Sequence, residues 1–266
     1  MNYGLQQKKV FLTLCFIAVS ITMVHAQEQR LYQYKTFVQN QDTLQYRILY
    51  PNNFSEEKEY PLVLFLHGAG ERGSNNESQL THGSSLFSTE KNREAFPAIV
   101  VFPQCPKEQY WSNAEIDRST RPIGFTFPLN QPATKALSLV EQLTTTLLEK
   151  PYVNTSQVYL GGLSMGGMGT FELLYRNPNT YAAAFAICGA GNPEATLNYA
   201  KTTPIWVFHG ANDDVVDPLF SVLMVKAILE NGGKPNFTLY QKDNHNSWDS
   251  AFSEPELLPW LFSTIK

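Results

Sequence analysis

The sequence predicts a three-layer α/β fold with a mostly parallel central sheet and an antiparallel strand pair at its N-terminal end. Short, wholly apolar runs recur along the chain, as expected of strands that are buried on both faces. Amphipathic helical segments lie between these runs, and this alternation places helices on both sides of a parallel sheet. The 266 residues, 43% of them hydrophobic, are enough for one sizeable core without disulfides or metals.

The first 26 residues are typical of a secretory signal peptide. Two lysines at positions 8 and 9 precede an uncharged apolar run from Val10 to Val24, and cleavage is expected after Ala26. The run is shorter than the roughly 20 residues of a spanning helix, which disfavours the alternative of a membrane anchor. Residues 27–266 are then expected to form a single exported domain, secreted or periplasmic, without stable membrane insertion.

Composition and cysteine content argue against a nucleic-acid-binding protein and against a disulfide. A net charge of −4 argues against a nucleic-acid binder that neutralises phosphates. Outside the predicted signal peptide the chain has two cysteines, Cys105 and Cys188. The predicted topology separates their strands by roughly 14 Å, beyond the ~7 Å limit between bridged Cα atoms. A disulfide is therefore disfavoured, although Cys105 lies past its strand end and could bend inward.

The strands are predicted as follows. Residues 31–38 and 44–50 alternate polar and apolar side chains around Asn40-Gln41-Asp42, which predicts an antiparallel hairpin. Five short apolar runs and a later sixth predict the remaining strands: Leu62–Leu66, Ala98–Phe102, Val158–Leu160, Ala182–Ile187, Ile205–Phe208 and Phe237–Tyr240.

Helices are predicted between and after these runs. Asp217 is placed to cap a helix that begins at Pro218 and stops at Gly232. Ser253 and Glu256 have the spacing of a capping box at the start of the last helix. The predicted helices cover Pro132–Lys150, Met165–Arg176, Pro218–Asn231 and a segment that starts near Ser253.

Two insertions, 70–96 and 103–131, are long and are expected to be irregular. Loops of this length in a compact domain are usually functional, and loops at the carboxyl ends of parallel strands hold the ligand site. The second insertion is aromatic, with Trp111 among its rings. These rings either line a ligand site or pack the insertion onto the domain.

The pentapeptide Gly162-Leu163-Ser164-Met165-Gly166 follows a predicted strand and opens a predicted helix. In that setting a serine is held in a strained turn with its hydroxyl exposed above the sheet. Side chains at positions 162 and 166 would collide where strand and helix approach each other. Ser164 is therefore a candidate nucleophile. A glycine-rich packing motif is the disfavoured alternative.

A serine nucleophile needs a base, and the base needs an orienting acid, in the chain order serine, acid, histidine. His245 lies in a polar loop just past the last strand and is the candidate base. His209 has no acid at a suitable place between it and the serine. Asp213 and Asp214 both follow the strand 205–208, and the residues alone leave the choice between them open.

Acyl transfer also requires donors for an oxyanion. The backbone N–H of Met165, directly after the serine, is one candidate, and that of Ala69, in the turn after the strand 62–66, is the other. His67 is then expected to hold this turn. The histidines of the chain show no short paired spacing, so no metal site is expected.

Together these segments resemble the secreted α/β-hydrolases of the carbohydrate esterase family 1, dienelactone-hydrolase-like and predicted-peptidase group, near feruloyl and acetylxylan esterases. The segments are His67-Gly68-Ala69-Gly70-Glu71-Arg72-Gly73, the serine pentapeptide, His209-Gly210 with Asp213, and His245-Asn246-Ser247-Trp248-Asp249. The resemblance implies Asp213 as the acid, since in this family the acid follows the His-Gly pair at that distance. It implies no cofactor, and it places the loop with Trp111 along the substrate pocket.

The resemblance implies a serine esterase that acts through an acyl-enzyme on acyl or feruloyl esters of plant polysaccharides or oligosaccharides. A serine peptidase and a general short-chain carboxylesterase are the alternatives. A peptidase would use the same three residues, but the chain has no evident propeller or cap domain that would select peptides. An inactive glycan-binding module on the same fold is a further alternative.

Overall fold

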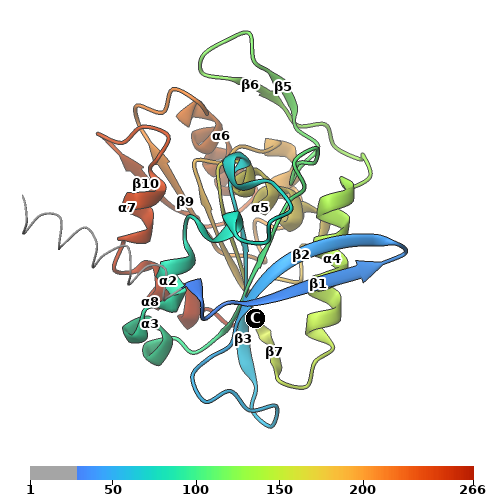
Figure 1. The fold of residues 1–266 in the computed structure, drawn as a ribbon. Helices are drawn as coiled ribbons and strands as arrows, with labels where there is room; N and C mark the ends of the chain where they lie inside the picture. Colours follow the sequence, from blue (N-terminus) through green and yellow to red (C-terminus); the bar gives the residue numbers. More distant parts are fainter. Residues whose placement is uncertain (1–28) are drawn as a thin grey trace, which may run out of the picture.

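An eight-stranded sheet runs through the middle of the structure, a computed structural model that describes residues 29–266 (Figure 1). The strand order is β1-β2-β4-β3-β7-β8-β9-β10. β2 is antiparallel to both β1 and β4, and all other neighbours are parallel, which confirms the predicted fold class. The strands are β1 Gln33–Gln39, β2 Asp42–Leu49, β3 Tyr60–Leu66, β4 Ile99–Pro103, β7 Val153–Leu163, β8 Ala183–Ile187, β9 Ile205–Gly210 and β10 Asn236–Tyr240.

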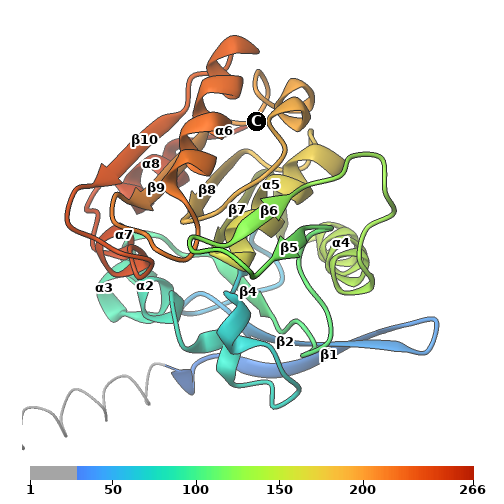
Figure 2. The ribbon, with the colours of Figure 1, turned by 90° about the horizontal axis from the view of Figure 1, so that it is seen from above.

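Helices cover both faces of this sheet (Figure 2). One face carries α4, α5 and α6, and the opposite face carries α2, α3, α7 and α8. The helices are α2 Ser84–Ser88, α3 Glu90–Ala95, α4 Lys135–Leu148, α5 Met165–Arg176, α6 Pro218–Glu230, α7 Trp248–Phe252 and α8 Leu257–Ser263. The predicted signal peptide lies outside the described residues. Within residues 29–266 no helix combines the length and apolar character needed to cross a membrane.

Alternate side chains of the central strands enter two separate hydrophobic cores. In β3, Leu62, Leu64 and Leu66 face the core under α4 and α5, while Val63 and Phe65 face the other. Successive side chains of a strand point to opposite faces, so a strand between two helical layers must be apolar at every position. This explains why the strands appear in the sequence as uninterrupted apolar runs.

The start predicted for the last helix, near Ser253, is wrong. Ser253 ends α7, and its hydroxyl donates to the carbonyl of Asp249 (2.8 Å) instead of capping a following helix. Pro255 then disfavours helical geometry at the residue before it, so α8 begins only at Leu257. The capping prediction at Asp217 is correct, since its side chain accepts from the N–H of Leu219 (2.8 Å).

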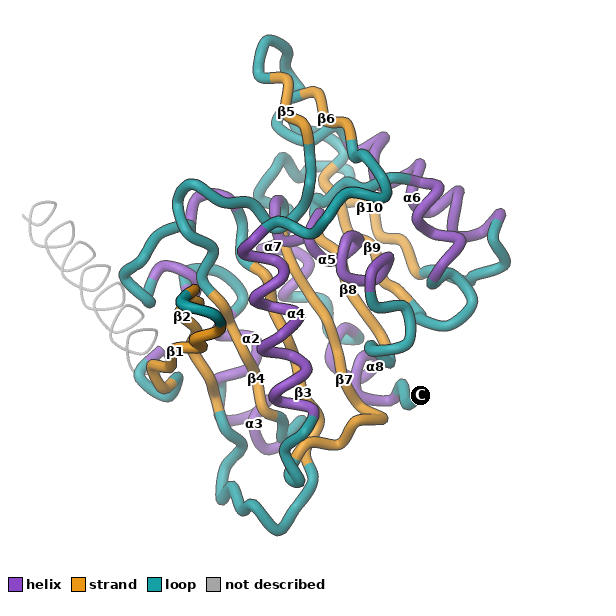
Figure 3. The backbone as a smooth tube through the Cα atoms, turned by 90° about the vertical axis from the view of Figure 1, so that its right-hand side faces the viewer, coloured by secondary structure: helices purple, strands orange, loops and turns teal. Residues whose placement is uncertain are grey.

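The two long insertions are more ordered than predicted. The first contains α2 and α3, and the second contains a small hairpin of β5 (Glu115–Asp117) and β6 (Gly124–Thr126) that projects from the body (Figure 3). Between the two strands of the hairpin, directly before β6, the N–H of Ile123 donates to the carbonyl of Val215 (2.9 Å). The second insertion is thereby attached to the loop that follows β9.

Both cysteines in the described part of the chain are free and buried. Cys105 follows β4 and Cys188 follows β8, and β3 and β7 lie between those two strands. The predicted separation of their strands is therefore correct, and each thiol packs into its own part of the core.

Candidate active site

Ser164 occupies the sharp turn between β7 and α5. Its backbone has φ 52° and ψ −118°, a conformation that a residue with a side chain rarely adopts. A Cβ on Gly166 would overlap the carbonyl of Leu66, and one on Gly162 would lie 2.9 Å from the Thr170 hydroxyl oxygen. The two glycines therefore let α5 approach the sheet closely enough to hold this turn.

The structure brings Ser164, His245 and Asp213 together from three distant segments. Ser164 Oγ lies 3.0 Å from His245 Nε2, and His245 Nδ1 lies 2.8 Å from Asp213 Oδ2. The carboxylate accepts from Nδ1–H, which leaves the lone pair of Nε2 to accept the serine proton. This is the geometry that a hydroxyl nucleophile and its base require.

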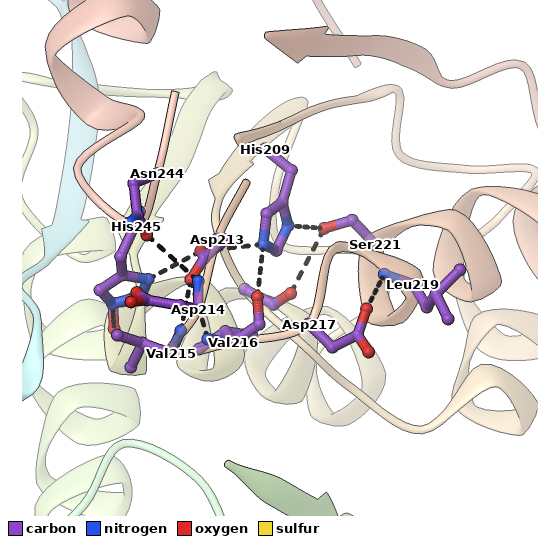
Figure 4. A network of polar contacts seen from close by, with 12 residues as sticks. His209, Asp213, Asp214, Val215, Val216, Asp217, Leu219, Ser221, Asn244 and His245 are labelled. Carbon is purple, nitrogen blue, oxygen red and sulfur yellow. Dashed lines mark hydrogen bonds and ion pairs between the residues drawn. The ribbon is translucent and has the colours of Figure 1, made fainter. Parts of the chain in front are cut away.

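Asp213, and not Asp214, contacts His245 (Figure 4). Asp213 is only 4% exposed, and its Oδ1 accepts from the N–H groups of Val215 and Val216, both at 2.9 Å. Asp214 is exposed. Of the two acids that the sequence left open, Asp213 is the one held against the imidazole.

A second histidine also contacts the carboxylate of Asp213. His209 is buried, and its Nε2 lies 3.1 Å from Asp213 Oδ2 and 3.0 Å from the carbonyl of Val216. Both neighbours are acceptors, so Nε2 carries a proton, while Nδ1 lies 2.7 Å from the Ser221 hydroxyl. Sequence reasoning missed this contact. The spacing of four residues between His209 and Asp213 was the available signal.

These contacts determine the charge of the acid. Burial by itself raises the pKa of Asp213, but hydrogen bonds from His209 and His245, the electrostatic attraction of the His245 ring and the N–H of Val216 outweigh it. The net result holds the pKa of this carboxyl well below its usual range. Asp213 therefore faces the imidazole of His245 as an anion.

The two predicted oxyanion donors belong to segments that meet at Ser164. Met165 is the first residue of α5, where a helix leaves its N–H groups without helical acceptors. Ala69 lies in the turn after β3, and a Cβ on the neighbouring Gly68 would be 3.7 Å from the Cβ of Ser164. Arg72 holds this turn, since its Nε donates to the carbonyl of Ala69 (3.0 Å).

His67 holds the same turn after β3 through hydrogen bonds of its buried ring. Its Nε2 accepts from the N–H of Cys105 (2.9 Å), so Nδ1 carries the proton and donates to the carbonyl of Gly68 (2.6 Å). Burial lowers the pKa of His67 to about 4, so the ring is neutral at ordinary pH. The contacts are those expected of a residue that holds the loop.

The depressed pKa of His67 predicts acid-sensitive stability. As the pH falls, the unfolded chain binds a proton at His67 first, because burial lowers the pKa of this histidine in the folded protein. The free energy of unfolding is therefore unaffected by protonation of His67 above about pH 6.5 and decreases as the pH falls towards 4. Between pH 7.5 and 4.5 this single group should remove about 2 to 3 kcal/mol from the free energy of unfolding. Urea denaturation of wild type and His67→Asn at both pH values measures it. The wild type should lose more stability than the variant, and equal losses would contradict the assignment.

A pocket of about 240 Å³ opens in front of Ser164. Its polar and charged lining residues besides Ser164 and His245 are Glu71, His82, Tyr110, Arg118 and Trp248. Its apolar lining residues include Ile123, Phe125, Leu163, Met168, Val215 and Val216, and Gly68, Ala69 and Gly70 border it at the turn after β3.

Trp111 does not line this pocket, contrary to the prediction. It is fully buried, packs edge-on against His67, and donates its indole N–H to the His67 carbonyl (3.2 Å). A Cβ on Gly169 would lie 2.6 Å from the Cβ of Trp111, so that glycine makes room for the indole. Tyr110 and Phe125 of the same insertion reach the pocket instead.

One group of potential metal ligands occurs among the described residues. Atoms of Cys188, Asp213 and His245 lie within 4.8 Å of one another. The carboxylate and the imidazole already bond to each other, and burial raises the pKa of the Cys188 thiol, which keeps it protonated. The carboxylate and the imidazole of this group thus already serve the hydrogen-bond network around Asp213.

The chain matches a known protein family. The family model for phospholipase/carboxylesterase matches residues 53–254. A bifunctional acetylxylan esterase/xylanase of Neocallimastix patriciarum is similar over 167 residues, with 30% identity, covering 63% of this chain and 21% of that protein. The chain thus spans about a fifth of the length of this curated relative.

Two solved structures are similar over nearly the whole described chain. A thermostable esterase has a TM-score of 0.80 and 32% identity, covering 90% of this chain and 64% of its own. A CE1 ferulic acid esterase of Anaeromyces mucronatus has a TM-score of 0.63 and 18% identity, and the match covers 88% of this chain and 90% of that one. At this identity the likeness is one of fold alone. The resemblance predicted from the sequence motifs is confirmed. The chain belongs to the phospholipase/carboxylesterase family, a group of hydrolases that act on ester bonds.

Proposed function

We propose that this protein is an exported serine esterase that hydrolyses carboxylic esters through an acyl-enzyme on Ser164. One observation carries the proposal: an unbroken hydrogen-bond path runs from Ser164 Oγ through His245 to the buried Asp213, and it opens onto a pocket. The predicted signal peptide supports export.

The geometry supports the following steps. Ser164 Oγ attacks the ester carbonyl carbon while His245 Nε2 takes the hydroxyl proton. The carbonyl oxygen becomes an oxyanion, and the N–H groups of Ala69 and Met165 are the candidate donors to it. When the tetrahedral intermediate collapses, the C–O bond to the alcohol breaks and His245 returns its proton to the departing oxygen. Water repeats the sequence on the acyl-enzyme and releases the acid.

For the substrate, we propose acetyl or feruloyl esters on plant polysaccharides or their oligosaccharides. The names of the similar proteins support this class, since they include an acetylxylan esterase and a ferulic acid esterase. The pocket supports it as well. Two of its rings, those of Tyr110 and Phe125, offer apolar surface to an acyl group or an aromatic acid.

A fluorophosphonate probe tests the nucleophile directly. Such probes form a stable phosphonyl ester only with an activated serine, so one adduct per chain is expected on the peptide that contains Ser164. Labelling should abolish hydrolysis of 4-nitrophenyl acetate and of an acetylated xylan in parallel. The surface variant Ser253→Ala should label like the wild type. Absence of labelling, or an adduct at another serine, would contradict the proposal.

A further inference from the structure

The pocket in front of Ser164 has two chemically different walls. One wall is mainly apolar: Met168 and Val216 belong to a small hydrophobic cluster against which Tyr110, Phe125 and Val215 pack. Arg118, from the loop between β5 and β6, is the charged residue that lines the pocket near Tyr110. The other wall is more polar. It consists of Glu71, His82 and Trp248, with the indole packed on the core under α7 and α8. A bound ester would meet a different environment at each end.

The polar wall is continuous with the base. The ring of Trp248 lies edge-on to His245, with centroids 5.4 Å apart, and the ring of His82 packs on Trp248 at 5.1 Å. Glu71 Oε1 lies 3.9 Å from His82 Nε2. None of the three side chains Glu71, His82 and Trp248 takes part in the proposed chemical steps.

The contact between Glu71 and His82 leaves capacity for a ligand. At 3.9 Å the two groups are too far apart for a direct hydrogen bond. Their side chains are 13% and 32% exposed, and both line the pocket. A carboxylate accepts hydrogen bonds at two oxygens, and an imidazole offers one further donor or acceptor.

The proposed mechanism indicates which part of the ester this polar wall faces. His245 must return its proton to the departing alcohol, so the alcohol leaves against the imidazole. The side chains packed beside His245 then face the alcohol part of the ester, and the apolar wall faces the acyl part. This assignment rests on the proposed function.

We infer that Glu71, His82 and Trp248 form a subsite for a carbohydrate alcohol with free hydroxyls next to the ester. The carboxylate of Glu71 accepts from neighbouring hydroxyls, and the imidazole of His82 makes a further hydrogen bond. Trp248 offers apolar surface to the C–H groups of the ring. The three residues determine specificity for the leaving alcohol.

The test compares two esters with the same acyl group and different alcohols, acetylated xylotriose and 4-nitrophenyl acetate. In Glu71→Gln and in His82→Ala, the ratio of kcat/KM for the sugar ester to that for the nitrophenyl ester should fall at least tenfold. The loss should lie mainly in KM. Glu230→Gln is the matched control, because it makes the same carboxylate-to-amide change in an exposed pair with Lys226 and should leave the ratio as in wild type.

Each other outcome counts against the subsite. Equal losses on the two esters would show that Glu71 and His82 only hold the turn after β3, and an unchanged ratio would show that the alcohol lies elsewhere. Wild type that hydrolyses the nitrophenyl ester but not the sugar ester would overturn the subsite alone. Folded wild type that hydrolyses neither ester would overturn the proposed function with it. Thermal unfolding of each variant confirms that it is folded.

Discussion

Replacing Ser164 with alanine should lower kcat for 4-nitrophenyl acetate by roughly 10³-fold or more, because serine, histidine and aspartate act as one unit. The alanine lacks the oxygen that attacks the carbonyl, and His245 alone cannot form the acyl-enzyme. Steady-state rates of purified wild type and variant measure the effect.

The fold should survive this substitution. Alanine keeps the Cβ of Ser164 in the same backbone conformation, so urea denaturation should give a free energy of unfolding within about 1 kcal/mol of the wild type. A folded variant that retains a tenth of the activity would refute Ser164 as the nucleophile. The candidate roles of His245 and of the donors Ala69 and Met165 would then lose their basis as well.

Replacing Asp213 with asparagine should lower kcat by roughly 10³-fold to 10⁴-fold. Every hydrogen-bond partner of this carboxylate is a donor: the N–H groups of Val215 and Val216 on Oδ1, and His245 and His209 on Oδ2. Whichever way the amide turns, its NH₂ group meets two donors. With the NH₂ group turned towards His245, the imidazole loses the contact that orients it and its proton. With the NH₂ group turned the other way, it opposes the N–H groups of Val215 and Val216 that hold the acid in place.

Asp214→Asn is the matched control for this prediction. It makes the same change one residue away, on an exposed side chain, and its rates should stay within about twofold of the wild type. The comparison also decides the alternative that the sequence left open. A larger loss in Asp214→Asn than in Asp213→Asn would overturn the assignment of the acid.

The parts of the fold that follow local rules were predictable from the sequence. The apolar runs revealed strands buried on both faces, and the glycines at positions 162 and 166 revealed a turn with no room for side chains. Chain order then led to His245. The choice of Asp213 over Asp214 needed the family pattern, because composition cannot show which of two neighbouring side chains turns inward.

The parts that failed depend on tertiary contacts. Trp111 was expected to face the ligand, but its indole N–H finds the carbonyl of His67 inside the core, and Tyr110 takes the place at the pocket. Whether an aromatic ring faces a pocket or the core depends on the opposing surface, here the space left by Gly169. Neither the period of the sequence nor its composition carries that information.

Short elements were missed for a related reason. The strands of the β5–β6 hairpin have three residues each, too few for a recognisable alternation. The segment containing Ser253 has the spacing of a capping box, but its hydroxyl bonds backwards to Asp249. The contact of His209 with Asp213 was not predicted from the sequence, because a lone histidine beside a glycine has many possible roles.

The state of the two cysteines bears on how this protein can be prepared. Cys105 and Cys188 are free and buried, and burial raises the pKa of both thiols, so neither offers the thiolate that oxidants and alkylating agents attack. Residues 29–266 depend on no covalent cross-link that a reductant could break. The described part of the chain should therefore keep its native packing in reducing buffers as well as in oxidising ones.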